Sequence, residues 1–206
     1  SRTENGNILS KIYLEAAAEA GYEINNDMNG YKQEGFGLMD TTIFDGKRQS
    51  TSVTYLHPIK QRQNLTLITN IQVSKIIIEN SSAIGVEIKN KNKLEKIFAE
   101  KEVLLSAGAI NSPQILMLSG VGPEEELKNH GINVISALNG VGENLQDHLE
   151  TYVQYECTKP VTLYSSFNPI NMALIGLQWF LFKKGIAAHS NLEIGGFIRT
   201  NEMVDY

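Results

Sequence analysis

The spacing of apolar residues predicts helices near both ends of the chain. Between residues 8 and 20, apolar side chains recur every three or four positions and the pattern stops at a glycine, which is typical of an amphipathic helix. Residues 50–61 show weaker helical spacing, which Pro58 interrupts or ends. A short helix is predicted over residues 123–130, because acids in a first turn suit the helix dipole, and a longer one over residues 169–184.

Runs of β-branched residues predict strands in the middle of the chain, and alternation predicts two more near its end. The predicted strands cover residues 65–69, 73–78, 83–89, 102–106, 152–157 and 194–199. Residues 25–37, rich in glycine and asparagine, are predicted to form a connecting loop. Because helices and strands do not alternate strictly, the fold class is expected to be mixed α+β or α/β, in two interleaved parts.

The fourth predicted strand leads into a turn of small residues, Ser106, Ala107 and Gly108. Ser112 and Pro113 then have the residue types of a helix cap and a first helical position. Strand, small-residue turn and helix is a geometry in which backbone N–H groups can face a phosphate. On these residues alone, a tight turn without any ligand is an equal alternative.

The composition is that of an ordinary globular chain, with 42% hydrophobic and 20% charged residues. The net charge of -5 leaves no basic face on average and argues against nucleic-acid binding. Cys157 is the one cysteine and cannot form an internal disulfide, and the histidines show no metal-ligand spacing. We therefore expect a reducing compartment and no metal centre, and we interpret His57, His130 and His189 as structural.

The longest apolar stretch, residues 170–182, contains Asn171 and Gln178. It is too short to span a bilayer, although it can rest on a membrane surface. The first residues lack the basic and apolar regions of a signal peptide. The Asn-x-Ser/Thr triplets at Asn64 and Asn80 are therefore interpreted as chance matches, and we expect a protein that is not secreted.

Residues 140–150 are the stretch of the chain that is richest in polar chemistry. His148 and Glu150 are two residues apart, so on an extended backbone both side chains point the same way and can enter one cavity. Asp147 is expected to hold the loop through backbone hydrogen bonds. The alternative for His148 is a histidine that only shapes the site, and the alternative for Glu150 is a surface glutamate.

Residues 106–122 and 140–150 together resemble the glucose-methanol-choline (GMC) family of flavin oxidoreductases. The first stretch has the Gly-Ala, Ser-Pro and Ser-Gly-Val-Gly elements of a family signature, and residues 29–37, 48–51 and 195–199 add to the similarity. The family's Gly-x-Gly-x-x-Gly fingerprint is absent. In the family this fingerprint lies near the N-terminus and the catalytic histidine near the C-terminus. The resemblance therefore implies a central piece without a catalytic residue, which alone binds FAD poorly and turns over nothing.

The same resemblance implies an FAD-binding Rossmann-like domain that is interleaved with a substrate domain on a mostly antiparallel sheet. Residues 49–146 would belong to the FAD-binding domain, and residues 1–48 and 147–206 to the substrate domain. The implied FAD-binding residues are Val73, whose backbone would meet the adenine, and Ser106, Ala107 and Gly108. On its own, Val73 is also an ordinary core residue of a strand.

Residues 147–157 resemble the choline-oxidising members of the family most closely. In those members a carboxylate two residues after an Asp-His pair faces the trimethylammonium head of the substrate. This implies that Glu150 and His148 bind substrate, and an aromatic residue such as Tyr152 would add a cation–π face. The implied reaction oxidises choline to betaine aldehyde with hydride transfer to flavin N5, and the electrons pass to an acceptor, a membrane quinone.

For location, the resemblance implies the cytoplasmic side of a bacterial inner membrane or the mitochondrial inner membrane, with peripheral attachment. It leaves homo-oligomerisation open. Two other functions remain at this point. One is a family dehydrogenase of an uncharged alcohol or polyol, for which Glu150 would be dispensable. The other is a non-catalytic module that keeps the fold.

Overall fold

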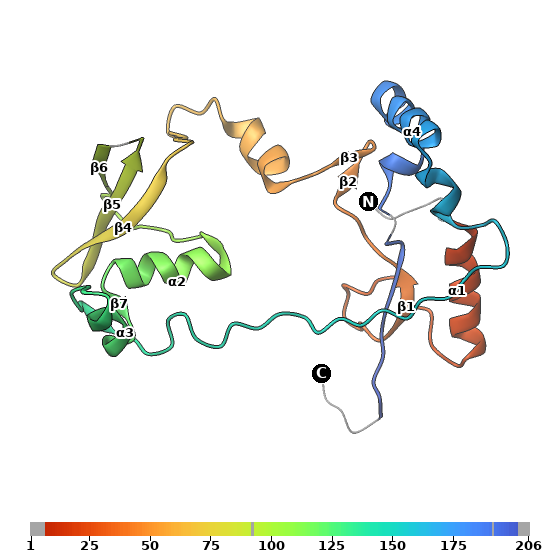
Figure 1. The fold of residues 1–206 in the computed structure, drawn as a ribbon, viewed down its shortest axis with the longest axis horizontal. Helices are drawn as coiled ribbons and strands as arrows, with labels where there is room; N and C mark the ends of the chain where they lie inside the picture. Colours follow the sequence, from red (N-terminus) through yellow and green to blue (C-terminus); the bar gives the residue numbers. More distant parts are fainter. Residues whose placement is uncertain (1–6, 92, 191, 202–206) are drawn as a thin grey trace. The chain divides into compact units, whose positions relative to one another are not determined.

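The computed structural model describes residues 7–91, 93–190 and 192–201. The chain divides into two compact units (Figure 1). The first unit combines Ser1–Gln63 with Val153–Tyr206, and the second is the continuous stretch Asn64–Tyr152. Both units mix helices with antiparallel strand pairs, as the sequence predicts. The assignment of particular ranges to an FAD-binding and a substrate domain stays a prediction.

A three-stranded antiparallel sheet is the centre of the second unit. Its strands, in spatial order, are β4 (Gln72–Glu79), β5 (Ser82–Asn90) and β6 (Lys93–Phe98). Asn80 and Ser81 join β4 to β5 with φ of 49° and 62°, the left-handed conformation that tight hairpins prefer. The strands predicted over residues 73–78 and 83–89 are confirmed. The sequence did not predict β6, an exposed edge strand whose lysines and glutamate break the apolar pattern.

Helix α2 (Gly108–Leu118) packs against β4, and a buried serine fastens the two elements. The Ser119 hydroxyl accepts a hydrogen bond from the backbone N–H of Ile76 at 2.7 Å. It also donates one to the carbonyl of Ile115 at 2.5 Å. Because both bonds form away from water, they fix the C-terminal end of α2 on the sheet.

Helix α3 (Glu124–Asn129) follows β7 (Val121–Gly122), which pairs in parallel with β8 (Ser136–Ala137). Leu127 anchors α3, since only 1% of its surface is exposed. The acids of the first turn lie where the helix dipole favours them. The helix predicted over residues 123–130 is therefore confirmed.

Three of the predicted strands are wrong. Residues 65–69, 102–106 and 152–157 form no strand. Burial still alternates in the second of these segments, where Val103 and Leu105 are half-buried and their neighbours are exposed. Residues 102–106 thus have the burial pattern of a strand. An extended segment needs a partner to form a sheet, and no strand within the described ranges pairs with any of the three segments.

The start of α2 also differs from the prediction. The helix begins at Gly108, so Ser112 and Pro113 lie inside it. The Ser112 hydroxyl reaches back and accepts the backbone N–H of Ala107 at 3.0 Å. Serine therefore caps the residue ahead of the helix from within, and Pro113 costs the helix a single backbone donor close to its N-terminus.

In the first unit, segments from the two ends of the sequence form one sheet. β1 (Gly35–Leu38) pairs antiparallel with β9 (Ile194–Phe197), and α1 (Ile8–Glu19) packs against β1. The predicted helix over residues 8–20 and the predicted strand over residues 194–199 are confirmed. The edge-to-face contacts of Tyr13 and Tyr22 with Phe36, at ring distances of 5.8 and 5.2 Å, join the helix to the sheet.

The prediction of a loop over residues 25–37 is wrong at its C-terminal end, which belongs to β1. A Cβ atom on Gly37 would lie 2.0 Å from the carbonyl oxygen of Asn25, so only glycine permits this close approach. The partner strand comes from the far end of the chain. Local turn residues therefore masked a strand whose pairing is entirely long-range.

Seven further elements of the described residues belong to the first unit. They are β2 (Ile43–Phe44), β3 (Lys47–Arg48), η1 (Ser52–Leu56), η2 (His57–Ile59), η3 (Leu163–Phe167), α4 (Pro169–Phe182) and η4 (Ile186–Ala188). The helix predicted over residues 50–61 is instead a π-helical turn, η1, followed by a 3₁₀ turn that contains Pro58. The helix predicted over residues 169–184 is confirmed by α4.

Candidate functional site

The turn at the N-terminus of α2 is the first candidate site, and it lies in the second unit. Gly108 has φ of 89°, and a Cβ atom built on it would meet no other atom within 4 Å. Ala107 at the cap position gives α2 no side-chain hydrogen bond, and the first turn has no acid. The first N–H groups of the helix are therefore free to face a negatively charged group such as a phosphate. Ser106, beside them, is exposed.

Val73 lies on β4, the strand against which α2 packs. Its side chain is half-buried and pairs across the sheet with Ile88. The register shifts between Val73 and Lys75, so the backbone departs here from a regular ladder. The valine and the turn thus belong to one packed body, and the structure gives Val73 a strand position with an irregular backbone beside it.

The polar segment of residues 140–150 runs without helix or strand after a turn. Gly142 and Asn144 adopt left-handed conformations, with φ of 83° and 55°. Asp147 accepts the backbone N–H of His148 at 2.8 Å, a backbone hydrogen bond of the predicted kind between neighbouring residues. The segment is therefore shaped by backbone turns and by Asp147, and its larger polar side chains are left exposed.

Glu150 lies beside an aromatic ring. The Tyr152 hydroxyl donates a hydrogen bond to the Glu150 carboxylate at 3.0 Å, so these two side chains share one side of the segment. His148 is exposed, and its backbone N–H is bound to Asp147. The structure thus brings Glu150 together with Tyr152, while His148 precedes them on the same segment.

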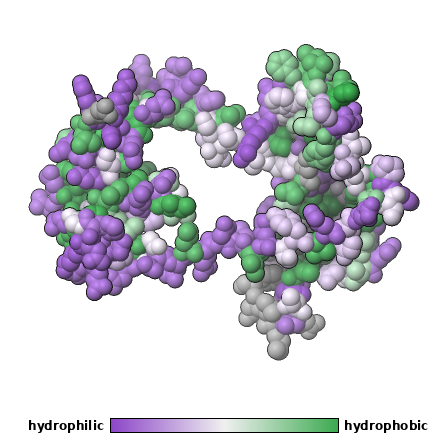
Figure 2. Space-filling model, viewed as in Figure 1, coloured by the Kyte–Doolittle hydropathy of each residue, from purple (hydrophilic) through white to green (hydrophobic). Residues whose placement is uncertain are grey.

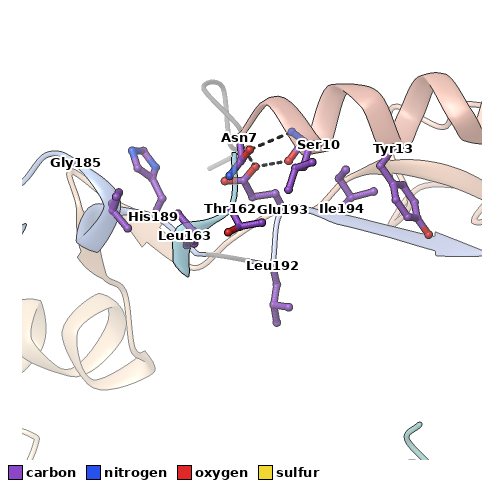
Figure 3. Close-up of a pocket in the computed structure, with 12 residues that line it drawn as sticks. Asn7, Ser10, Tyr13, Thr162, Leu163, Gly185, His189, Leu192, Glu193 and Ile194 are labelled. Carbon is purple, nitrogen blue, oxygen red and sulfur yellow. Dashed lines mark hydrogen bonds between the residues drawn. The ribbon is translucent and has the colours of Figure 1, made fainter. Parts of the chain in front are cut away.

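A cavity of about 830 Å³ opens in the first unit, and sequence reasoning missed it (Figure 3). At its wall, the Glu193 carboxylate accepts hydrogen bonds from the backbone N–H of Asn7 at 2.8 Å and from the buried Ser10 hydroxyl. The Asn7 side chain also donates to the carbonyl of Val161 at 3.3 Å. No lysine or arginine in the described part of the chain pairs with Glu193. The sequence contained one sign that Glu193 is unusual, because it is the first acidic residue after Glu156.

The histidines do not form a metal site. His130 lies 3.1 Å from the Glu126 carboxylate on α3, and His189 lines the cavity of the first unit. Across residues 7–91, 93–190 and 192–201, no group of three or more His, Cys, Asp or Glu residues is placed to hold a metal ion. Cys157 is exposed and unpaired.

The comparison with protein families decides the relationship. The sequence model of the GMC oxidoreductase family matches residues 1–150, which include both candidate segments of the second unit. The chain belongs to the GMC oxidoreductase family. The resemblance that the sequence motifs predict is therefore confirmed.

Two relatives show which members of the family the chain is similar to. The chain is 48% identical to the mitochondrial choline dehydrogenase of Homo sapiens over 206 residues, which is 100% of this chain and 35% of that protein. It is 46% identical to the oxygen-dependent choline dehydrogenase of Brucella anthropi, over 100% of this chain and 37% of that protein. The chain thus spans about a third of the length of these GMC relatives.

Solved structures show the same fold. An FAD-dependent oxidoreductase from Chaetomium thermophilum matches 94% of this chain and 35% of its own, with a TM-score of 0.78 and 29% identity. A formate oxidase matches 92% of this chain and 33% of its own, with a TM-score of 0.78 and 25% identity. The family and these neighbours confirm the predicted fold class and indicate FAD as the cofactor.

Proposed function

We propose that this GMC chain is the central part of an FAD-dependent choline dehydrogenase, which oxidises choline to betaine aldehyde. The observation that carries the proposal is the similarity to choline dehydrogenases, which reaches 48% identity and covers the whole chain. Choline is a primary alcohol with a quaternary ammonium head. A binding site must therefore recognise a permanent positive charge that cannot donate a hydrogen bond.

Glu150 and Tyr152 supply the chemistry that recognises such a head. A carboxylate attracts the trimethylammonium group through charge alone, and the face of an aromatic ring adds a cation–π contribution. The Tyr152 hydroxyl, bound to Glu150 at 3.0 Å, orients the carboxylate. We assign Glu150 and His148 to substrate binding.

The residues assigned to the cofactor are Val73, Ser106, Ala107 and Gly108. The open turn at Gly108 and the uncapped first turn of α2 fit a phosphate-bearing group. FAD held by these residues would supply the acceptor for the hydride that leaves the alcohol carbon. The hydroxyl proton passes to a base. We assign no residue of this chain to that catalytic role.

The electron acceptor and the location complete the proposal. Two electrons leave the substrate in each turnover, and we propose that they pass to a membrane quinone. The protein is then attached peripherally to the cytoplasmic side of a bacterial inner membrane or to the mitochondrial inner membrane. No helix in the described ranges has the length and hydrophobicity needed to cross a bilayer.

The test is anaerobic flavin reduction in the full-length protein. Choline should bleach the flavin absorbance rapidly, whereas the neutral isostere 3,3-dimethylbutan-1-ol, which has the same shape without the charge, should bleach it only at much higher concentration. Equal bleaching by both alcohols would reject recognition of the positive charge, and bleaching by the neutral alcohol without bleaching by choline would keep the GMC oxidoreductase and reject choline as its substrate. The isolated chain of 206 residues is the control, and it should hold no stoichiometric flavin.

A further inference from the structure

Helix α4 packs on the first unit by one narrow row of side chains. The half-buried residues of the helix are Asn171, Ile175 and Trp179, which are spaced four residues apart. The Trp179 indole N–H donates to the carbonyl of Gly46 at 2.7 Å, which attaches the helix to the loop between β2 and β3. The helix therefore has a defined inner row and a defined outer face.

The outer face of α4 is apolar along its whole length. It consists of Ile170, Ala173, Leu174, Leu177, Phe180 and Leu181. These residues follow the spacing of one helix face, opposite the inner row, and all of them are exposed. In Figure 2 the same helix is a continuous hydrophobic surface at the upper right. A surface helix normally turns its polar side to solvent, so α4 is inverted relative to that rule.

The stretch of sequence that contains α4 has lysines and no acids. Between Glu156 and Glu193 the sequence contains no acid, although the whole chain has a net charge of -5. Lys183 and Lys184 directly follow the helix, and Lys183 lies 3.9 Å from the centre of the Trp179 ring. One acid, Asp45, adjoins Gly46 in the β2–β3 loop that the helix contacts. An exposed apolar face with cations at its end is complementary to a surface that is apolar beneath and negative above.

We propose that the outer face of α4 docks on an anionic lipid bilayer, with the exposed Lys184 at the headgroups. The inference rests on the proposed function, because a dehydrogenase that reduces a membrane quinone has to meet the membrane. The 14 residues of α4 rise only about 21 Å, less than the hydrocarbon thickness, so the helix lies in the interface and does not cross it.

The competing occupant is the remainder of the full-length protein. A helix that is apolar all round is often an internal element of a larger domain. The two possible occupants predict different effects of a charged substitution on the outer face of α4. A glutamate on a face that is buried in protein damages folding and flavin binding, whereas a glutamate on a lipid-facing surface leaves the folded enzyme intact and weakens only membrane binding.

The experiment is vesicle flotation of the full-length protein with phosphatidylcholine vesicles, with and without phosphatidylglycerol. Wild type should float only with the anionic vesicles and should be released by salt. Phe180→Glu and Lys184→Glu should each weaken flotation by about tenfold. The matched controls are Phe98→Glu on β6 and Lys60→Glu, which change exposed side chains of the same types outside the α4 region and should float as wild type does.

Each result decides the proposal. Loss of flotation in Phe180→Glu and Lys184→Glu, with flavin content and choline bleaching unchanged in detergent, supports it. Loss of flavin or solubility in Phe180→Glu shows that protein covers the face, and this overturns the proposal, as does a wild type that ignores anionic vesicles. Choline bleaching is read separately in each variant, so failure of the proposed function is distinguishable from failure of the docking surface.

Discussion

Each of the two units of this GMC chain is stabilised internally in a different way. The second unit is one continuous stretch, in which consecutive strands pair and the buried Ser119 and Leu127 fasten the helices. The first unit joins segments from both ends of the sequence, and Glu193 connects them by its bonds to Asn7 and Ser10. A unit built from neighbouring segments can rely on its backbone ladder and core, whereas one built from distant segments depends on a few specific contacts.

The largest effect that tests this difference is expected in the second unit. Leu127→Ala removes the most deeply buried side chain of the described residues and should destabilise residues 64–152 by about 2 to 5 kcal/mol. Amide hydrogen exchange of the full-length protein, resolved by peptide, measures this. The matched control Leu94→Ala changes an exposed leucine of β6 and should have little effect. Faster exchange in both units alike would contradict independent cores.

The next effect is expected in the first unit. Glu193→Ala removes the carboxylate that accepts from the Asn7 N–H and from the Ser10 hydroxyl, and should cost about 1.5 to 3 kcal/mol. Exchange should rise in α1 and β9 and stay unchanged in the β4–β5–β6 sheet. Glu193→Gln keeps an acceptor oxygen and should lose less. If the two substitutions behave identically, hydrogen bonding is not what joins the segments.

Substitution of Gly37 tests whether β1 needs glycine for a close backbone approach or only for flexibility. Gly37→Ala places a Cβ atom 2.0 Å from the carbonyl oxygen of Asn25, and should open the β1–β9 pairing at a cost of about 1 to 3 kcal/mol. Gly140→Ala is the matched control, because its Cβ would meet nothing within 4 Å. Equal exchange in the two variants would rule out the contact as the reason for glycine in β1.

The smallest effect concerns one surface charge of the second unit. On α3 the hydrogen bond from Lys128, with its positive charge, lowers the pKa of Glu124 below its ordinary value. A carboxyl whose pKa is lowered on folding adds stability above its unfolded pKa, and this contribution is lost as the pH falls through the lower, folded value. Lys128→Gln should raise the pKa of Glu124 in an NMR titration. An unchanged titration would mean that the ion pair does not form in solution.

The comparison also explains how much the sequence could predict. Elements with local causes were found correctly: α1 and α4 from their apolar spacing, and β4 and β5 from their β-branched runs. Of the two strands that pair across the whole length of the chain, β9 was predicted and β1 was not, since β1 resembles a glycine-rich loop until β9 pairs with it. Residues 102–106 failed in the opposite sense, with the pattern of a strand and no partner among the described residues.

For the candidate site, the sequence indicated the chemistry better than the geometry. The motifs located Glu150 and the turn at Gly108, but the contact of Glu150 with the Tyr152 hydroxyl and the open space at Gly108 required coordinates. Glu193 was missed because its partners, Asn7 and Ser10, lie at the other end of the chain. Spacing within one segment cannot report such a contact.

The central claim is that Glu150 recognises the cationic head of choline, and one substitution in the full-length protein tests it most directly. Anaerobic flavin reduction should be compared between wild type, Glu150→Gln and the matched control Glu143→Gln, which changes an exposed acid of the same segment. The account predicts that Glu150→Gln alone weakens apparent choline binding by about 2 kcal/mol, roughly thirtyfold, while bleaching by 3,3-dimethylbutan-1-ol is unaffected. Unchanged choline binding in Glu150→Gln would contradict the account.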